Sequence, residues 1–217
     1  MQCVILITGG KDSSLAALML SQYFDVRAAN CNFGILESWH SAESVAKKLR
    51  LRFNVVKLDM EVMEKAAEQM IKDGFPRNGL NVIHLHALSK VAENGAKMIA
   101  DGTRRDDRAP LLSLSDIMSF EMKNNVQYVR PLAGFGRRTL DLLVEKFLVI
   151  EESEGTRSSD YELEIRKFME GKYGEEKVKE VFPKHHEHSR VVDVKREKVF
   201  GNLKKRKKSL YPFFSFL

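Results

Sequence analysis

The amino-acid sequence predicts an α/β fold with a five-stranded, mainly parallel sheet. Over the first 150 of its 217 residues, short apolar runs typical of buried strands alternate with segments of helical periodicity. The first apolar run, residues 4–7, leads through a glycine turn directly into strong helix formers at 15–20. Beyond residue 150 the pattern becomes helical, which predicts a helical segment packed on the sheet or on a partner.

The expected elements follow one another along the chain. Strands are expected at residues 4–7, 26–31, 53–58, 97–100 and 127–129. Helices are expected at residues 15–20, 41–49, 61–72, 82–93, 115–123, 139–150, 161–170 and 175–181. Residues 73–81 contain two glycines and a proline and are expected to form a loop. This pattern divides the chain into an α/β domain at 1–150, a helical segment without strands at 151–194, and a basic and aromatic tail at 195–217.

A glycine-rich turn joins the first strand to the first helix, with the sequence Thr8-Gly9-Gly10-Lys11-Asp12-Ser13-Ser14. Adjacent glycines give the backbone conformations that are closed to other residues, and a ligand can approach them without meeting a Cβ atom. Asp12, Ser13 and Ser14 are good N-cap residues. Free amides and hydroxyls should therefore converge where the helix dipole favours negative charge. The turn is predicted to bind phosphate.

A second polar turn follows the fourth expected strand, with the sequence Asp101-Gly102-Thr103-Arg104-Arg105-Asp106-Asp107-Arg108. Ligands of open α/β sheets bind at the carboxyl ends of the strands, near the point where the strand order reverses. The first and fourth strands would be neighbours there, so both turns should face one site. Asp106 and Asp107 would supply oxygen ligands for Mg²⁺. Capping of a helix near Ala109-Pro110 is the alternative role for them.

These turns resemble the PP-loop family, the N-type ATP pyrophosphatases, whose adenine nucleotide alpha-hydrolase-like fold is a three-layer α/β/α sandwich. The family pattern SGGxDS stands here as Thr8-Gly9-Gly10-Lys11-Asp12-Ser13, which keeps a hydroxyl at the first position. The second family pattern, Gly-Thr or Gly-His followed by one or two aspartates, is matched by Gly102-Thr103-Arg104-Arg105-Asp106-Asp107. Arg130-Pro131-Leu132 is similar to the Arg-Pro-Leu of several tRNA-modifying members. The resemblance covers residues 3–150.

The resemblance implies that ATP is cleaved between its α and β phosphates and that an adenylate forms on the substrate. The implied cofactors are ATP and Mg²⁺, with Asp12, Asp106 and Asp107 as metal ligands. The implied catalytic residues are Lys11, Asp12, Asp106, Arg104 and Arg105. The nucleotide would contact Thr8, Gly9, Gly10, Lys11, Asp12, Ser13, Ser14, Gly102 and Thr103. The adenine would lie against the end of the second strand, near Asn32 and Phe33.

The positions of cysteine and histidine bear on which substrate is adenylated. Sulfur-transferring members commonly carry cysteines in the helix before the fourth strand, where this chain has Val82-Ile83-His84-Leu85-His86. Cys31 is interpreted as a small buried hydrophobe, with a catalytic role as the alternative. His84 and His86 are two residues apart and do not share a helix face, so we expect one packed and one solvated side chain. No iron-sulfur cluster is predicted, nor zinc at the later histidines, His185, His186 and His188.

The positive charge is concentrated at the end of the sequence. The net charge is +6, and from residue 195 onward eight Lys or Arg stand against one acid, which is +7, so the preceding residues sum to 6 − 7 = −1. The stretch from Lys195 to Lys208 is interpreted as an arm for RNA phosphates or as a solvated terminus. The aromatic residues at 211–217 could instead pack on the body or on a second subunit.

A cytoplasmic protein is expected from the apolar pattern. The first strand starts at residue 3, which leaves no room for a signal peptide. No apolar run approaches the roughly 18 residues of a membrane span. We expect an ATP pyrophosphatase that adenylates a tRNA base during a thiolation-like modification, as a homodimer or with a separate sulfur or nitrogen donor protein. The alternatives are an amide- or nitrile-forming ligase for a small carboxylate, and an ATP-binding partner subunit without turnover.

Overall fold

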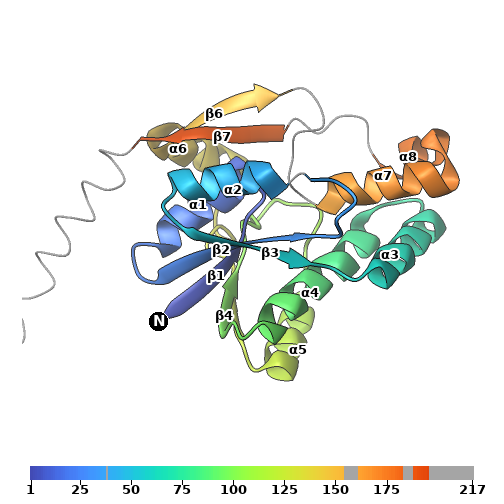
Figure 1. Cartoon of the computed structure of the whole chain (residues 1–217), viewed down its shortest axis with the longest axis horizontal. Coiled ribbons are helices and arrows are strands. Elements are labelled where there is room, and N and C mark those ends of the chain that lie inside the picture. The colour runs from blue at the N-terminus through green and yellow to red at the C-terminus, as the bar shows by residue number, and fades with distance from the viewer. Residues whose placement is uncertain (38, 154–160, 183–187, 196–217) are drawn as a thin grey trace, which may run out of the picture.

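Five parallel strands form the central sheet in the computed structural model, which describes residues 1–37, 39–153, 161–182 and 188–195 (Figure 1). The strand order is β3-β2-β1-β4-β5. The strands are β1 (Gln2–Leu6), β2 (Asp25–Asn32), β3 (Arg52–Lys57), β4 (Met98–Ala100) and β5 (Gln127–Val129). The helices are α1 (Lys11–Leu20), α2 (Trp39–Lys48), α3 (Met60–Asp73), α4 (Arg77–Glu93), α5 (Leu114–Asn124), α6 (Arg137–Phe147), α7 (Tyr161–Tyr173) and α8 (Glu175–Val181). The predicted fold class is confirmed.

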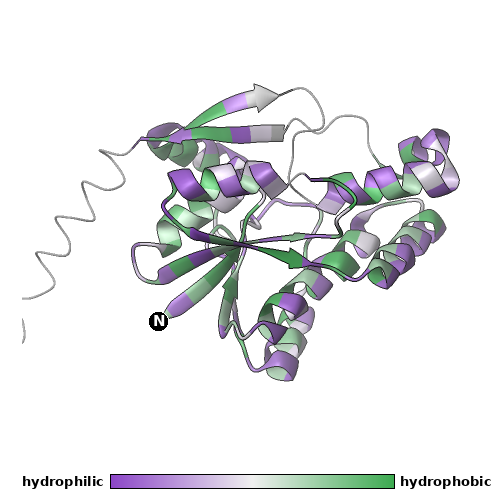
Figure 2. Ribbon diagram, viewed as in Figure 1, coloured by the Kyte–Doolittle hydropathy of each residue, from purple (hydrophilic) through white to green (hydrophobic). Residues whose placement is uncertain are grey.

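Both faces of the sheet are covered, which explains why its strands are continuous apolar runs rather than alternating ones. Along β1, Ile5 packs into one core and its neighbour Leu6 into the other. Helices α1, α2 and α6 cover the first face, and α3, α4, α5, α7 and α8 cover the second (Figure 1). Hydrophobic residues line the strands, whereas hydrophilic ones lie on the outer sides of the helices (Figure 2).

The strand order reverses between β1 and β4. Ile5 of β1 lies opposite Ala28 of β2 on one side and Ala100 of β4 on the other. The chain runs outward from β1 to β3, returns to β4 and continues to β5. The prediction that the first and fourth strands are neighbours is therefore confirmed, and the turns after β1 and β4 lie at the same edge of the sheet.

The sequence-based prediction missed a two-stranded antiparallel sheet. Its strands are β6 (Leu148–Ser153) and β7 (His188–Val194). The expected helix at 139–150 ends at Phe147, and the prediction of no strand beyond it was wrong. All of α7 and α8 separates the two strands along the chain, so this pairing is not local. Leu148, Val191 and Val194 are buried in the core beneath α1, and this burial stabilises the pair.

The loop expected at 73–81 is also shorter than predicted, because α4 begins at Arg77 instead of residue 82. Gly79 was assigned to that loop, but it lies in α4 at the point where α4 crosses α3. A Cβ atom at Gly79 would lie 2.6 Å from the Ala66 carbonyl oxygen and 2.5 Å from Met70 Cγ. The glycine permits close packing of the two helices, and this tertiary contact outweighs its poor helix propensity.

The remaining predictions for the end of the chain lie largely outside the described residues. This applies to His185, His186 and the tail beyond Lys195, whereas His188 lies in β7. The predicted boundary at residue 150 falls within β6, and the division into three parts stays a prediction. Among the described helices, none is both long and apolar enough to cross a membrane.

Candidate functional site

The first turn of the site connects β1 to α1. Gly9 has a φ of +83°, in the left-handed region that side chains disfavour, and this reverses the chain above the sheet. Helix α1 begins at Lys11 with Gly10 as its N-cap, four residues earlier than expected. Asp12, Ser13 and Ser14 therefore lie inside the first helical turn rather than at the cap. The Ser14 amide donates to the Gly10 carbonyl oxygen at 3.2 Å, whereas the amides of Lys11, Asp12 and Ser13 precede the first such acceptor of the helix, so the turn is suited to bind an anion.

The hydroxyl groups of this turn stabilise the turn itself. The Ser14 hydroxyl donates to the Gly10 carbonyl oxygen at 2.7 Å, and Ser14 is fully buried. The Thr8 amide donates to the Ser13 hydroxyl at 3.3 Å. The Thr8 hydroxyl lies 3.4 Å from the Ser13 hydroxyl. Ser14 is thus placed to shape the turn, while Thr8 and Ser13 lie beside the open amides.

The second turn packs directly on the first one. A Cβ atom at Gly102 would lie 2.5 Å from the Ser13 nitrogen and 2.8 Å from the Asp12 carbonyl carbon. Backbone atoms do not move aside at such distances, so glycine is required at this position. The Thr103 amide donates to Asp101 Oδ1 at 2.9 Å, which orients the start of the turn. The two predicted turns therefore form one continuous surface at the carboxyl edge of β1 and β4.

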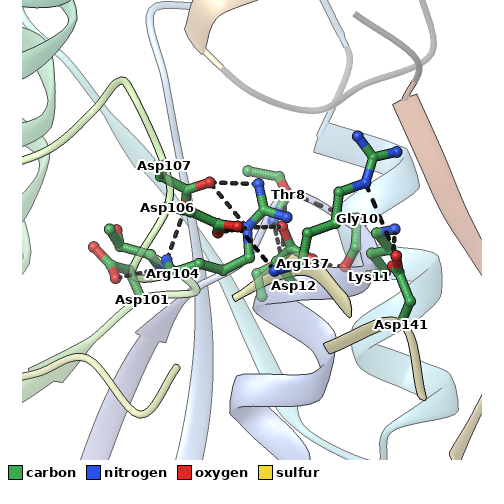
Figure 3. Close-up of polar contacts among 12 residues, drawn as sticks. Thr8, Gly10, Lys11, Asp12, Asp101, Arg104, Asp106, Asp107, Arg137 and Asp141 are labelled. Carbon is green, nitrogen blue, oxygen red and sulfur yellow. Dashed lines mark hydrogen bonds and ion pairs between the residues drawn. The ribbon is translucent and has the colours of Figure 1, made fainter. Parts of the chain in front are cut away.

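Arg104 is surrounded by three carboxylates (Figure 3). Its Nε lies 3.3 Å from Asp12 Oδ2 and 3.8 Å from Asp106 Oδ1. Asp107 Oδ1 accepts hydrogen bonds from Arg104 Nε at 2.9 Å and Nη2 at 2.5 Å, while its Oδ2 accepts one from the Arg104 amide at 2.7 Å. The structure thus brings together four predicted site residues from two loops, and Asp107 fixes the guanidinium in place.

Asp12 carries the largest chemical perturbation in this cluster. Burial raises its pKa to about 6, although the neighbouring Arg104 acts in the opposite direction. Its Oδ1 atom is buried and has no hydrogen-bond partner. An unpartnered carboxylate oxygen is energetically unfavourable in the free protein, because burial removes water without replacing it. A cation bound with phosphate would satisfy this oxygen.

Two other predicted residues hold the rim of the site. Lys11 Nζ lies 2.7 Å from Asp141 Oδ1 of α6, and Asp141 also lies 3.9 Å from Arg137 Nε. Asp106 Oδ2 accepts from the Arg137 amide at 2.9 Å, so Asp106 caps α6 rather than a helix near residue 109. This hydrogen bond lowers the pKa of Asp106. Arg105 lies against Gly136, the N-cap of the same helix.

The cluster is not a metal site made by protein atoms alone. Within the described ranges, no three His, Cys, Asp or Glu side chains gather in a way that could hold a metal ion. Mg²⁺ is usually held by one or two carboxylates together with substrate phosphates and water. The free Asp12 oxygen fits that mode of binding, and the assignment of Asp12, Asp106 and Asp107 to Mg²⁺ stays a prediction.

At the end of β2, the predicted adenine contact is partly taken by the protein itself. Glu164 of α7 is fully buried and accepts hydrogen bonds from three backbone amides. The Phe33 amide donates to Oε2 at 2.8 Å, and those of Ile35 and Leu36 donate to Oε1 at 2.9 and 3.2 Å. The Phe33 amide is thus occupied, whereas the Nδ2 atom of buried Asn32 has no partner. Asn32 is the donor left for a ligand here.

A buried polar network behind the second turn was missed by the sequence analysis. Asp101 Oδ2 lies 2.7 Å from His84 Nε2 and accepts a hydrogen bond from the Tyr128 hydroxyl. His84 Nδ1 lies 2.7 Å from the Tyr161 hydroxyl of α7. These residues come from α4, β4, β5 and α7, so no sequence motif indicates them. As expected, one of the two histidines is packed, while His86 lies near the surface beside Asp59.

Cys31 lies in the interior of the sheet, 5% exposed, and burial raises its pKa to about 12. Its Sγ lies 3.9 Å from the Ala87 carbonyl oxygen of α4. A thiol with this pKa is protonated at neutral pH, and only the thiolate is an effective nucleophile. The geometry therefore favours the interpretation of Cys31 as a buried hydrophobe.

A family model and one relative match most of the chain, and a second relative matches a shorter part of it. A family model described as "Family of unknown function (DUF7411)" matches residues 1–193. The uncharacterized protein MJ0690 of Methanocaldococcus jannaschii is 42% identical over 196 residues, which cover 89% of this chain and 96% of that protein. The uncharacterized protein MJ1638 of the same organism is 33% identical over 67 residues, or 30% of this chain and 26% of that protein.

A solved structure is also similar to this chain. It is described as a predicted subunit of tRNA methyltransferase from Methanocaldococcus jannaschii. The TM-score is 0.82 with 40% sequence identity, and the match covers 90% of this chain and 98% of that one.

Proposed function

The chain belongs to the family of unknown function DUF7411, and we propose that it binds ATP and cleaves it to AMP and pyrophosphate, adenylating a tRNA base for modification. One observation carries this proposal: the backbone contact of Gly102 with Ser13 makes a single site of the two turns. That site combines the open amides of a helix N-terminus with a fixed arginine and a buried carboxylate oxygen. A Walker-type GxxxxGK[ST] sequence does not occur in the chain.

The residues of the site divide the work of binding and charge stabilisation. The amides of the first turn of α1 would bind the pyrophosphate portion of ATP. Arg104, already oriented by Asp107, would stabilise negative charge that develops on the phosphates as the bond breaks. Asp12 and Asp106 would hold Mg²⁺, which would neutralise the departing pyrophosphate. Lys11 would bind the phosphates after its ion pair with Asp141 breaks.

Two observations support tRNA as the acceptor. The similar solved structure is described as a predicted subunit of tRNA methyltransferase. The basic residues from Lys195 to Lys208 provide positive charge in a chain whose body is close to neutral, and such charge favours nucleic-acid phosphates. Binding energy from the RNA backbone could then position a base at the adenylation site.

The proposal is tested by measuring pyrophosphate release from Mg-ATP with and without bulk tRNA. We expect tRNA to stimulate release by the wild-type protein. Asp12→Asn should lower release about 100-fold, the scale of losing one charge-stabilising group. Asp25→Asn, at the opposite edge of the sheet, serves as the matched control and should change nothing. Equal release by wild type and Asp12→Asn would contradict the proposed site.

A second candidate function is a partner subunit that binds ATP without turnover. It is favoured by the description of the similar structure as a subunit. It is also favoured by the ion pairs that hold Arg104 and Lys11 to carboxylates in the free protein. Micromolar ATP binding with no AMP formed in the presence of tRNA, alone or with cell extract, would favour this candidate over the enzyme.

A further inference from the structure

The pair β6–β7 touches the predicted phosphate turn at one point. Arg190 of β7 forms an isolated antiparallel bridge with Gly10, outside the two sheets. The Val191 amide donates to the Gly9 carbonyl oxygen at 3.1 Å, which fixes the strand against the turn. Val191 itself is fully buried in the core beneath α1. The strand is therefore anchored on the site by both its backbone and a neighbouring side chain.

The bridge also defines the side on which Arg190 lies. Residues directly opposite each other in an antiparallel pair carry their side chains on the same face. Arg190 is therefore on the face toward which a Cβ atom of Gly10 would point. That Cβ position is 3.4 Å from the Thr8 hydroxyl oxygen. Because Gly10 has no side chain, no Gly10 atom separates Arg190 from this side of the turn.

The guanidinium of Arg190 is positioned without a carboxylate. Its Nε atom is buried and has no hydrogen-bond partner, and no ion pair of Arg190 is found in the described part of the chain. In contrast, Lys11, Arg104 and Arg137 are each paired with an aspartate. A buried donor without a partner costs free energy unless a ligand satisfies it. Among the described residues of the site, Arg190 and Arg105 thus have no ion pair, and Arg190 is the one bridged to the phosphate turn.

We propose that Arg190 is a phosphate-binding residue, and that β7 completes the anion site formed by residues 8–14. This inference rests on the proposed function and adds β7 as an element that supplies unpaired positive charge beside the turn. The ligand class is a polyphosphate ester or pyrophosphate, since Arg190 is bridged to Gly10, the N-cap of α1, rather than to the turn that carries Asn32. Guanidinium groups bind phosphate oxygens through two parallel hydrogen bonds, which a lysine does not reproduce.

The test compares binding of ATP, inorganic pyrophosphate and adenosine by calorimetry in the presence of Mg²⁺. We expect Arg190→Met to weaken the binding of ATP and of pyrophosphate about 10- to 100-fold, which is the range for hydrogen bonds to charged groups. Arg190→Lys should recover part of the loss, and adenosine binding should not change. Arg52→Met removes the same charge at the amino end of β3 and serves as the matched control.

A measurement on the wild-type protein keeps the proposal testable if Arg190→Met does not fold. Phenylglyoxal modifies arginines, and mass spectrometry locates the modified residues. Pyrophosphate with Mg²⁺ should protect Arg190 from modification by phenylglyoxal, and the modification of Arg52 should not change. Tight binding by the wild type with no effect at Arg190 would overturn this inference while the proposed function stands. Absence of ATP and pyrophosphate binding by the wild type would overturn both.

Discussion

At the residue scale, Asp12 combines a proposed role in the site with a cost in stability. Its side chain is about 30% exposed, but its Oδ1 atom is buried without a partner, and its pKa is raised to about 6. A carboxyl group with a raised native pKa binds more protons when folded than when unfolded. Its contribution to stability therefore falls as the pH rises from about 4 to about 6, and the loss persists above that range. Binding sites commonly carry such a cost.

Asp12→Asn should therefore stabilise the free protein while it lowers the proposed pyrophosphate release. We expect a gain of about 1–2 kcal/mol in the free energy of unfolding at pH 7.5, because the buried charge is removed. The gain should disappear near pH 4, where Asp12 is protonated in both states. Urea unfolding at the two pH values measures it, with Asp25→Asn as control. A stability loss at pH 7.5 would contradict the raised pKa.

The buried network around Asp101 has the opposite pH dependence. Burial alone raises the pKa of Asp101, but hydrogen bonds from His84, Tyr128 and the Thr103 amide outweigh this and lower it. The stability contributed by the ionised carboxylate is present above the ordinary pKa and is lost as the pH falls through the lowered native pKa. Since Asp101 also orients the Gly102 turn, the network supports the site from behind.

Tyr128→Phe should weaken this network without creating a cavity. We expect a loss of about 1–3 kcal/mol at pH 7, because one donor to a buried carboxylate is removed. The midpoint of acid unfolding should move to higher pH. Tyr23→Phe, which removes an exposed hydroxyl group, provides the comparison. If both variants unfold with the same acid midpoint, Tyr128 does not stabilise the ionised form of Asp101.

At the scale of elements, α4 and α7 contribute the buried side chains that support the turns of the candidate site. Helix α4 carries His84 and packs closely on α3 at Gly79. Helix α7 contributes Tyr161 to the network and Glu164 to the turn after β2. The predicted helical segment is thus part of the support of the site. A charged acceptor such as Glu164, with three amide donors, orders the backbone at 33–36.

Two glycine substitutions separate packing from helix propensity. Gly79→Ala should destabilise the protein by about 1–3 kcal/mol, because its Cβ atom would overlap the α3 backbone. Gly171→Ala lies in α7 with no atom near the new Cβ position, and it should stabilise by about 0.5–1 kcal/mol. Thermal unfolding measures both changes. Stabilisation by both variants would mean that α3 and α4 are not in close contact at Gly79.

At the scale of the whole molecule, charge and fold are distributed differently along the chain. The sheet and its helices account for a body with a formal charge near zero, while residues 196–217 carry seven Lys or Arg and one acid, or 7 − 1 = +6. Both site turns belong to the neutral body. Binding of ATP and binding of RNA are therefore expected to depend on separate parts of the chain.

Deletion of residues 196–217 should lower tRNA affinity at low salt by at least tenfold and reduce its salt dependence, because fewer phosphate contacts release counterions. Pyrophosphate affinity should remain unchanged. Deletion of 209–217 alone keeps every basic residue of the tail and is the matched control. Filter binding between 50 and 200 mM salt, a range over which phosphate contacts weaken steeply, measures both. If the salt dependence of tRNA affinity were unchanged after the longer deletion, the hypothesis that the tail binds RNA would be contradicted.

The parts of the site that follow from local sequence were predicted, and those that depend on distant contacts were not. The turns at 8–14 and 101–108 were predicted because glycines, hydroxyls and charges stand together after apolar strands. The start of α1 at Lys11 was missed, since a glycine N-cap does not show in propensity. Glu164, Tyr161 and Arg190 were missed because each contacts a turn at the sheet edge or the Asp101 network from an element remote in the chain.

By itself, the sequence determined the α/β class, the order of the five strands along the chain and the two turns that face one another. These features follow from periodicity and from turn chemistry, which act over a few residues. The tertiary structure alone decided the pairing of β6 with β7, the network at Asp101 and the bridge between Arg190 and Gly10. These contacts join residues far apart in the chain, and their stability comes from burial in a shared core rather than from local propensity.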